Sequence, residues 1–93
     1  MTQKRSRLQI YLDVLRVINN GVQKPTHIMY KCNLSWVPLK DVLESLMAQG
    51  LVMKGESRHR KTYEITEKGR EVLRYFDKAK ELIAPGPVSE FKL

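Results

Sequence analysis

The stretch that most constrains what this chain can fold into runs from Asn33 to Gly50 and has the pattern of a single capped helix. Ser35 is a suitable N-cap because its hydroxyl can accept a hydrogen bond from a backbone N–H of the first turn. Pro38 also fits in this turn, because the backbone N–H that proline lacks would have no partner within the helix there. The helix then carries a continuous apolar stripe: Leu39, Val42, Leu43, Leu46 and Met47. Gly50 supplies the left-handed residue that ends such a helix. We therefore expect an amphipathic helix with one buried face.

The opposite face of this helix is polar except at its beginning. It carries Trp36, Val37, Lys40, Asp41, Glu44 and Ser45. A large indole at the exposed start of a helix predicts a contact with another molecule. The alternative is that Trp36 packs within the chain, against the following hairpin or the first helix.

The segment that follows, residues 51–66, predicts two short strands around a basic turn. Tyr63 and Ile65 share one face and Thr62 and Glu64 the other, which is the alternation of a half-buried strand. The turn ends in a run of basic residues: Arg58, His59, Arg60 and Lys61. Such a run is usually only a solvated turn, but its position directly after the presented helix favours contact with phosphates.

Two shorter amphipathic helices are predicted before Asn33. The first covers residues 6–19, and its apolar residues are expected to face the core: Leu8, Tyr11, Leu12, Leu15 and Ile18. The second covers residues 26–32, and Asn33 makes the tight turn into the presented helix. Between them, Val22 and Gln23 leave room for a short third strand beside the hairpin.

A last helix is predicted over residues 67–84, with Thr66 as its cap. About seventeen residues at about 1.5 Å each make a rod of roughly 25 Å, longer than a small three-helix core needs to cover. Its surplus apolar positions are Phe76, Ala79, Leu82 and Ile83. They predict a homodimer through this helix, since a second copy is the simplest partner. Residues 85–93, with two prolines and a glycine, are predicted to be disordered.

Length and composition indicate one small domain over residues 4–84. The 93-residue chain has a net charge of +7 and a pI near 9.8, which favours an anionic partner such as nucleic acid or an acidic membrane surface. No segment has the length and apolarity of a membrane span, and no signal peptide is recognisable, so we expect a cytoplasmic, nucleoid-associated protein. Cys32 is the only cysteine and is predicted to be a small buried hydrophobe.

The sequence does not indicate an enzyme, a metal site or a cofactor. It has no glycine-rich phosphate loop and no nucleophile with a visible base. His27, His59 and Cys32 do not form a tetrahedral ligand set. Four further aromatic residues occur at core spacing and are predicted to pack rather than to stack on bases: Tyr11, Tyr30, Tyr63 and Phe76.

Four segments in order carry a family resemblance across about residues 4–77: KRSRLQIYLDVL, PTHIMYKCNLSW, LESLMAQGLV and YEITEKGREVL. With them the chain resembles the archaeal winged helix-turn-helix family that includes the small basic DNA-binding proteins of Sulfolobus. The resemblance implies an α+β fold with a three-helix core, a two- to three-stranded wing hairpin and an extended C-terminal helix. It also implies DNA binding, commonly by a dimer joined through the C-terminal helices. This chain departs from the family in its shorter last helix and in Trp36, where a smaller aromatic residue is expected.

These considerations predict a double-stranded DNA-binding protein, most simply a transcriptional regulator. The major-groove contacts would come from Ser35, Trp36, Val37 and Lys40. The wing contacts to the DNA backbone would come from Arg58, His59, Arg60 and Lys61. Secondary phosphate contacts would come from Thr26, His27 and Lys31. Lys4, Arg5 and Arg7, in a mobile basic arm, can add sequence-independent attraction.

Three other functions stay open at this stage. A chromatin-like protein would bind DNA with little selectivity. A protein-interaction module would use Trp36 and Val37 as an apolar anchor for another protein. A small-molecule sensor is a third possibility, although the sequence shows no appended ligand domain.

Overall fold

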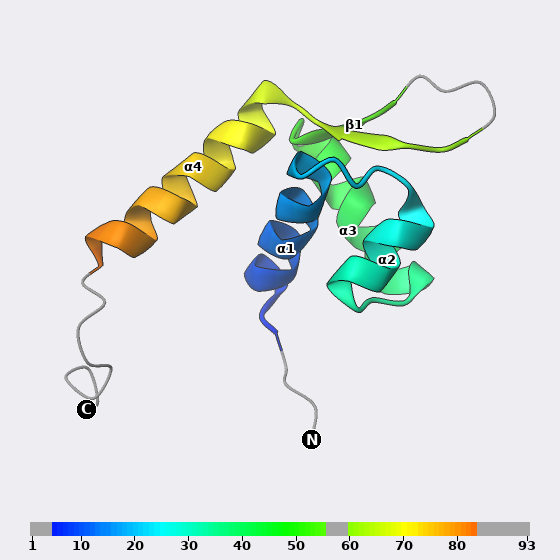
Figure 1. Ribbon diagram of the computed structural model, residues 1–93, viewed down its shortest axis with the longest axis horizontal. Helices are drawn as coiled ribbons and strands as arrows, with labels where there is room; N and C mark the ends of the chain where they lie inside the picture. The colour runs from blue at the N-terminus through cyan, green and yellow to red at the C-terminus, as the bar shows by residue number, and fades with distance from the viewer. Residues whose placement is uncertain (1–4, 56–59, 84–93) are drawn as a thin grey trace.

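The computed structural model describes residues 5–55 and 60–83. Its elements in chain order are α1 (Arg7–Asn19), α2 (Pro25–Cys32), α3 (Trp36–Ala48), β1 (Val52–Lys54), β2 (Tyr63–Ile65) and α4 (Glu67–Leu82) (Figure 1). The predicted α+β winged helix-turn-helix is confirmed. The helices begin and end within two residues of the positions expected from the sequence.

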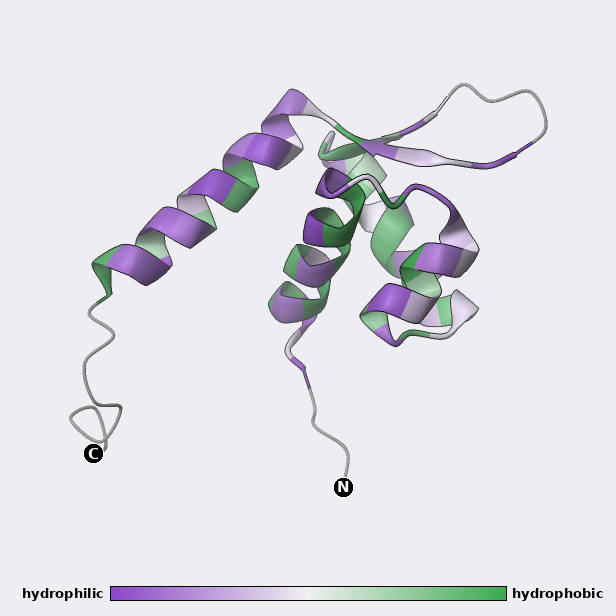
Figure 2. Ribbon diagram, in the orientation of Figure 1, coloured by the Kyte–Doolittle hydropathy of each residue, from purple (hydrophilic) through white to green (hydrophobic). Residues whose placement is uncertain are grey.

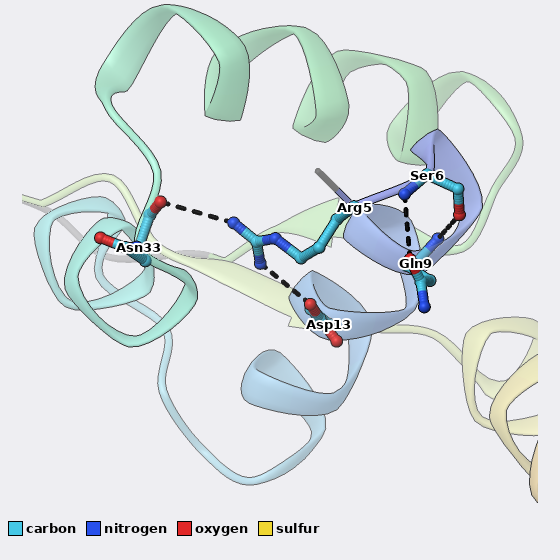
Figure 3. Close-up of polar contacts among 5 residues, drawn as sticks. All are labelled: Arg5, Ser6, Gln9, Asp13 and Asn33. Carbon is cyan, nitrogen blue, oxygen red and sulfur yellow. Dashed lines mark hydrogen bonds and ion pairs between the residues drawn. The ribbon is translucent and has the colours of Figure 1, made fainter. Parts of the chain in front are cut away.

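Local capping hydrogen bonds explain where two of these helices begin. Ser6 and Gln9 form a capping box at the start of α1, with each side chain bonded to the other residue's backbone N–H (Figure 3). Thr66 caps α4 by accepting a hydrogen bond from the Gly69 backbone at 3.0 Å. Ser35 is the N-cap of α3 as predicted, but its hydroxyl accepts no bond from that helix's described first turn.

Two residues with left-handed backbone separate the elements around α3. Asn33 has φ 56° and ends α2, and Gly50 has φ 75° and follows α3. Asparagine and glycine are the residues that adopt this conformation most readily. The predicted turns at both positions are confirmed.

The core lies where α1, α2, α3 and the hairpin meet, and the most hydrophobic parts of these elements are green in Figure 2. Leu15, Ile28, Leu39, Leu43 and Leu46 are its largest fully buried side chains, together with Val14. Leu8 was expected in this core, but about half of it is exposed because it lies in the first turn of α1, beyond the packed part. Val14 is completely buried instead.

The wing is a two-stranded antiparallel sheet in the described part of the chain, with Val52 opposite Ile65 and Lys54 opposite Tyr63. The predicted third strand at Val22 and Gln23 does not form. One backbone hydrogen bond takes its place, from the Tyr63 N–H to the Gln23 carbonyl at 3.0 Å. The loop before α2 is therefore tied to the hairpin without extending the sheet.

Helix α4 packs on the rest of the molecule mainly through its first half. Its buried residues are Gly69 and Leu73, and Figure 1 shows the helix diverging from α1 toward its C-terminal end. It ends at Leu82, two residues earlier than predicted, with Ile83 as its C-cap. Residues 84–93, including the predicted disordered tail, lie outside the described residues, as do residues 1–4 of the predicted basic arm.

Candidate nucleic-acid interface

The two elements expected to face a partner lie on the same side of the molecule. In Figure 1 the wing hairpin and α2 lie on one side of α1, and α4 lies on the other. Helix α3 begins next to the end of α2, because only Asn33, Leu34 and Ser35 separate the two helices. This side is the candidate interface.

The start of α3 is exposed as predicted. Val37 is 68% exposed, and Ser35 and Lys40 are also on the surface. Trp36 is 37% exposed, so part of its indole is covered by the protein and part is available to a partner. The predicted groove residues thus lie together in the first two turns of one helix.

Further along α3, the exposed face becomes acidic. Asp41 and Glu44 are both exposed there and outnumber Lys40. Glu44 also affects the wing, because burial first and the nearby Glu44 carboxylate second raise the pKa of Tyr63 above its usual value of 10.0. Only the beginning of α3 therefore suits close approach to phosphates.

The basic wing residues are described in part. Arg60 and Lys61 are exposed and lead directly into β2. Arg58 and His59 lie outside the described residues, so their predicted role stays a prediction.

Helix α2 presents a polar outer face. Thr26, His27 and Lys31 are all exposed on it, as their proposed phosphate contacts require. Tyr30 was predicted to be in the core, and this is wrong because its side chain is 84% exposed. Ile28 and Cys32 define the buried face, and a residue two positions from each points to the opposite side of a helix. That spacing was a usable signal for placing Tyr30 on the surface.

Two other aromatic residues that were predicted to pack, Tyr63 and Tyr11, are in or beside the core. Tyr63 is buried, and Tyr11 and Phe76 are half-buried. The Tyr11 hydroxyl donates a hydrogen bond to Ser45 Oγ at 2.9 Å. Ser45 was expected on the outer face of α3 but faces α1 through this bond.

Arg5 was expected in a mobile arm, but its guanidinium makes two contacts within the chain (Figure 3). It pairs with the Asp13 carboxylate at 2.9 Å and donates to the Asn33 carbonyl at 3.4 Å. These contacts tie the start of α1 to the turn between α2 and α3. Arg5 therefore makes contacts within the fold, whereas Arg7 is exposed to solvent.

Cys32 is buried at the end of α2, as predicted. Burial and then the nearby Asp13 carboxylate raise the pKa of its thiol to about 11, against a smaller opposite effect of Arg5. A buried thiol that stays protonated is a poor nucleophile and a poor metal ligand. Among the described residues, His, Cys, Asp and Glu side chains form no group of three or more that could hold a metal ion.

Comparison with known proteins agrees with this arrangement. The profile of the winged helix-turn-helix family matches residues 4–84, and the chain belongs to that family. An uncharacterised protein of Methanocaldococcus jannaschii is 30% identical over 69 residues, which are 74% of this chain and 67% of the relative. The predicted relationship to archaeal winged-helix proteins is confirmed.

Solved structures show the same fold. Sso10a-2, a DNA-binding protein from Sulfolobus solfataricus, has a TM-score of 0.69 and 26% identity, with 84% of this chain and 81% of that chain covered. ZitR, a zinc-responsive MarR family member from Lactococcus lactis, has a TM-score of 0.67 and 17% identity. That match covers 87% of this chain but only 57% of ZitR, so the likeness is one of fold alone.

None of the described helices combines the length and apolarity that crossing a membrane requires.

Proposed function

We propose that this chain binds double-stranded DNA as a transcriptional regulator. The observation that carries the proposal is the common side occupied by α2, the start of α3 and the basic wing stem in a chain with a net charge of +7 (Figure 1). The similarity to Sso10a-2, which is a DNA-binding protein, supports it. Association with the nucleoid would follow from DNA binding.

In this proposal α3 enters the major groove by its first two turns. Trp36 and Val37 would contact thymine methyl groups, Lys40 a guanine or a phosphate, and Ser35 a phosphate. The carboxylates of Asp41 and Glu44 would keep the second half of α3 away from the backbone. Arg58, His59, Arg60 and Lys61 would follow the DNA backbone from the wing, while Thr26, His27 and Lys31 would add phosphate contacts.

The proposed assembly is a homodimer formed through α4. Leu82 and Ile83 are 73% and 67% exposed, Ala79 is exposed, and Phe76 is half-buried. These apolar side chains extend beyond the part of α4 that covers the core, and a second α4 would bury them. Two half-sites about one helical turn apart, roughly 34 Å, would then be read from one face of the DNA.

The test is a titration of a labelled mixed-sequence duplex at several salt concentrations. Wild-type protein should bind at low salt, and the R60E/K61E variant should bind more weakly with a flatter dependence of log K on log salt concentration. The matched control is K78E/K80E, which makes the same charge change on α4. If wild-type protein does not bind duplex at 50 mM salt, DNA binding is refuted and the protein-interaction function becomes the better explanation.

A further inference from the structure

A groove lies between α2 and the base of the wing. It has a volume of about 430 Å³, within the range of about 300–1,000 Å³ typical of ligand sites. Its lining comes from the loop before α2 (Gly21–Lys24), from the outer face of α2 (His27, Tyr30 and Lys31) and from Thr62, which immediately precedes β2. The hydrogen bond from the Tyr63 N–H to the Gln23 carbonyl joins the loop wall to the strand wall.

The charged residues that the structure describes at this groove are basic. Lys24 and Lys31 lie at its wall together with His27, and none of the described residues that line it carries a carboxylate. Arg60 and Lys61 immediately precede Thr62, so the positive charge continues along the stem of the wing. The exposed face of α3, by contrast, has more carboxylates than cations. The strongest attraction for a polyanion on this side of the molecule therefore lies between α2 and the wing.

Tyr30 gives the groove a second property. Its ring is the most exposed of the large hydrophobic side chains that the structure describes, at 84%, and it stands in the same wall as Lys31. A ring left in water gains stability when an apolar surface covers it. A deoxyribose next to a phosphate offers both an apolar surface for the ring and an anion for the lysines. A free inorganic anion offers only the second.

We propose that this groove holds the sugar–phosphate backbone of one strand of duplex DNA. Lys24 and Lys31 contact successive phosphates, His27 donates a hydrogen bond to the same strand, and Tyr30 packs against a deoxyribose. The inference rests on the proposed DNA-binding function and adds to it a backbone site that includes two residues, Lys24 and Tyr30, absent from the predicted interface. It also assigns most of the salt dependence of binding to α2 and the wing rather than to α3.

The charge part is tested with the full chain and a mixed-sequence duplex, by measuring affinity over a range of salt concentrations. Replacing both lysines, K24Q/K31Q, should lower the slope of log K against log salt concentration by about 1.8, since each phosphate contact contributes about 0.9. The same relation gives an affinity loss of about 60-fold at 0.1 M salt. The matched control K78Q/K80Q, which removes two lysines from α4, should leave slope and affinity unchanged.

The ring part is tested by comparing Tyr30→Phe with Tyr30→Ala. The Phe variant keeps the apolar surface and should bind as wild type, whereas the Ala variant should lose about five- to tenfold in affinity with an unchanged salt slope. Tyr30 is exposed, so both variants should keep the wild-type unfolding midpoint, which circular dichroism checks.

Two outcomes overturn the inference and separate it from the proposed function. If wild-type protein binds duplex but K24Q/K31Q keeps its slope, the protein binds DNA without this groove. If K24Q/K31Q and K78Q/K80Q lower the slope equally, the effect is one of net charge and the groove has no special role. If wild-type protein fails to bind duplex at all, the proposed function fails together with the inference.

Discussion

Gly69 provides a sharp test of the packing between α4 and the wing. A Cβ added at this position would overlap with the Leu51 carbonyl oxygen and would lie only 2.6 Å from Ile65 Cγ1. The Leu51 carbonyl is backbone and accepts a hydrogen bond from the Thr66 N–H at 3.0 Å, so it cannot move away without disturbing the start of α4. We therefore expect Gly69→Ala to destabilise the protein.

The expected change in the free energy of unfolding follows from one stabilising effect and two destabilising effects. Alanine in place of glycine inside a helix normally stabilises by about 1 kcal/mol. Overpacking against a fixed neighbour costs about 1–3 kcal/mol, and weakening the Thr66–Leu51 hydrogen bond costs about 1 kcal/mol more. The balance is a destabilisation of about 1–3 kcal/mol, which for a domain of this size lowers Tm by about 5–20 °C.

Thermal and urea unfolding followed by circular dichroism measure this change. Lys78→Ala, at an exposed position of the same helix, is the control and should change the free energy of unfolding by less than about 0.5 kcal/mol. Adding Ile65→Ala to Gly69→Ala should not restore stability, because the clash with the Leu51 carbonyl would remain. A higher Tm for Gly69→Ala would mean that helix propensity dominates, and the close approach of α4 to the wing would be refuted.

Three further predictions concern other parts of the chain. Leu82→Lys combined with Ile83→Lys should halve the mass measured by sedimentation equilibrium if α4 forms the dimer; an unchanged mass would place the interface elsewhere. Asn33→Gly should leave the free energy of unfolding within about 0.5 kcal/mol of wild type, whereas Asn33→Val should lower it by about 1–2 kcal/mol, because φ is 56° there. The Cys32 thiol ionises near pH 9.0 when unfolded but at about pH 11 when folded, so the unfolded state loses its proton first and stability should fall as pH rises from 9 to 11. Cys32→Ala should show a smaller fall over that range, and an equal fall would assign the effect to other groups.

The parts of the fold that the sequence predicted well are those specified by local interactions. The stripe of α3, the left-handed residue Asn33 and the Thr66 cap each depend on a few neighbouring residues, and all three were predicted at the right positions. The third strand was predicted wrongly. The single hydrogen bond between Gln23 and Tyr63 that stands in its place depends on how two distant segments are positioned. The contacts of Arg5 were missed for the same reason, because its partners Asp13 and Asn33 are 8 and 28 residues away in the sequence.

The candidate interface was predicted less completely than the fold. Exposure at the start of α3 could be inferred from helical spacing, and Trp36 and Val37 are indeed on the surface. The groove beside α2 could not be predicted, because its walls come from the loop before α2, from α2 itself and from the residue that precedes β2, which only the tertiary structure brings together. Tyr30 was predicted to pack on the basis of its spacing, although a position two residues from both Ile28 and Cys32 lies on the opposite face of α2.

The joint between α3 and α4 determines how a dimer of this chain would present its two recognition surfaces. The Thr66 hydroxyl donates to the Gly50 carbonyl at 2.6 Å and Lys68 Nζ to the Gln49 carbonyl at 2.9 Å, so the end of α3 is bonded directly to the start of α4. Farther along, Arg16 of α1 pairs with Asp77 of α4 at 2.9 Å, but both side chains are substantially exposed and such pairs typically contribute about 0–1 kcal/mol. If α4 carries the dimer contact, the separation of the two α3 helices depends mainly on this joint and on the close packing at Gly69. Changing the ion pair alone should then leave the preferred half-site spacing unaltered.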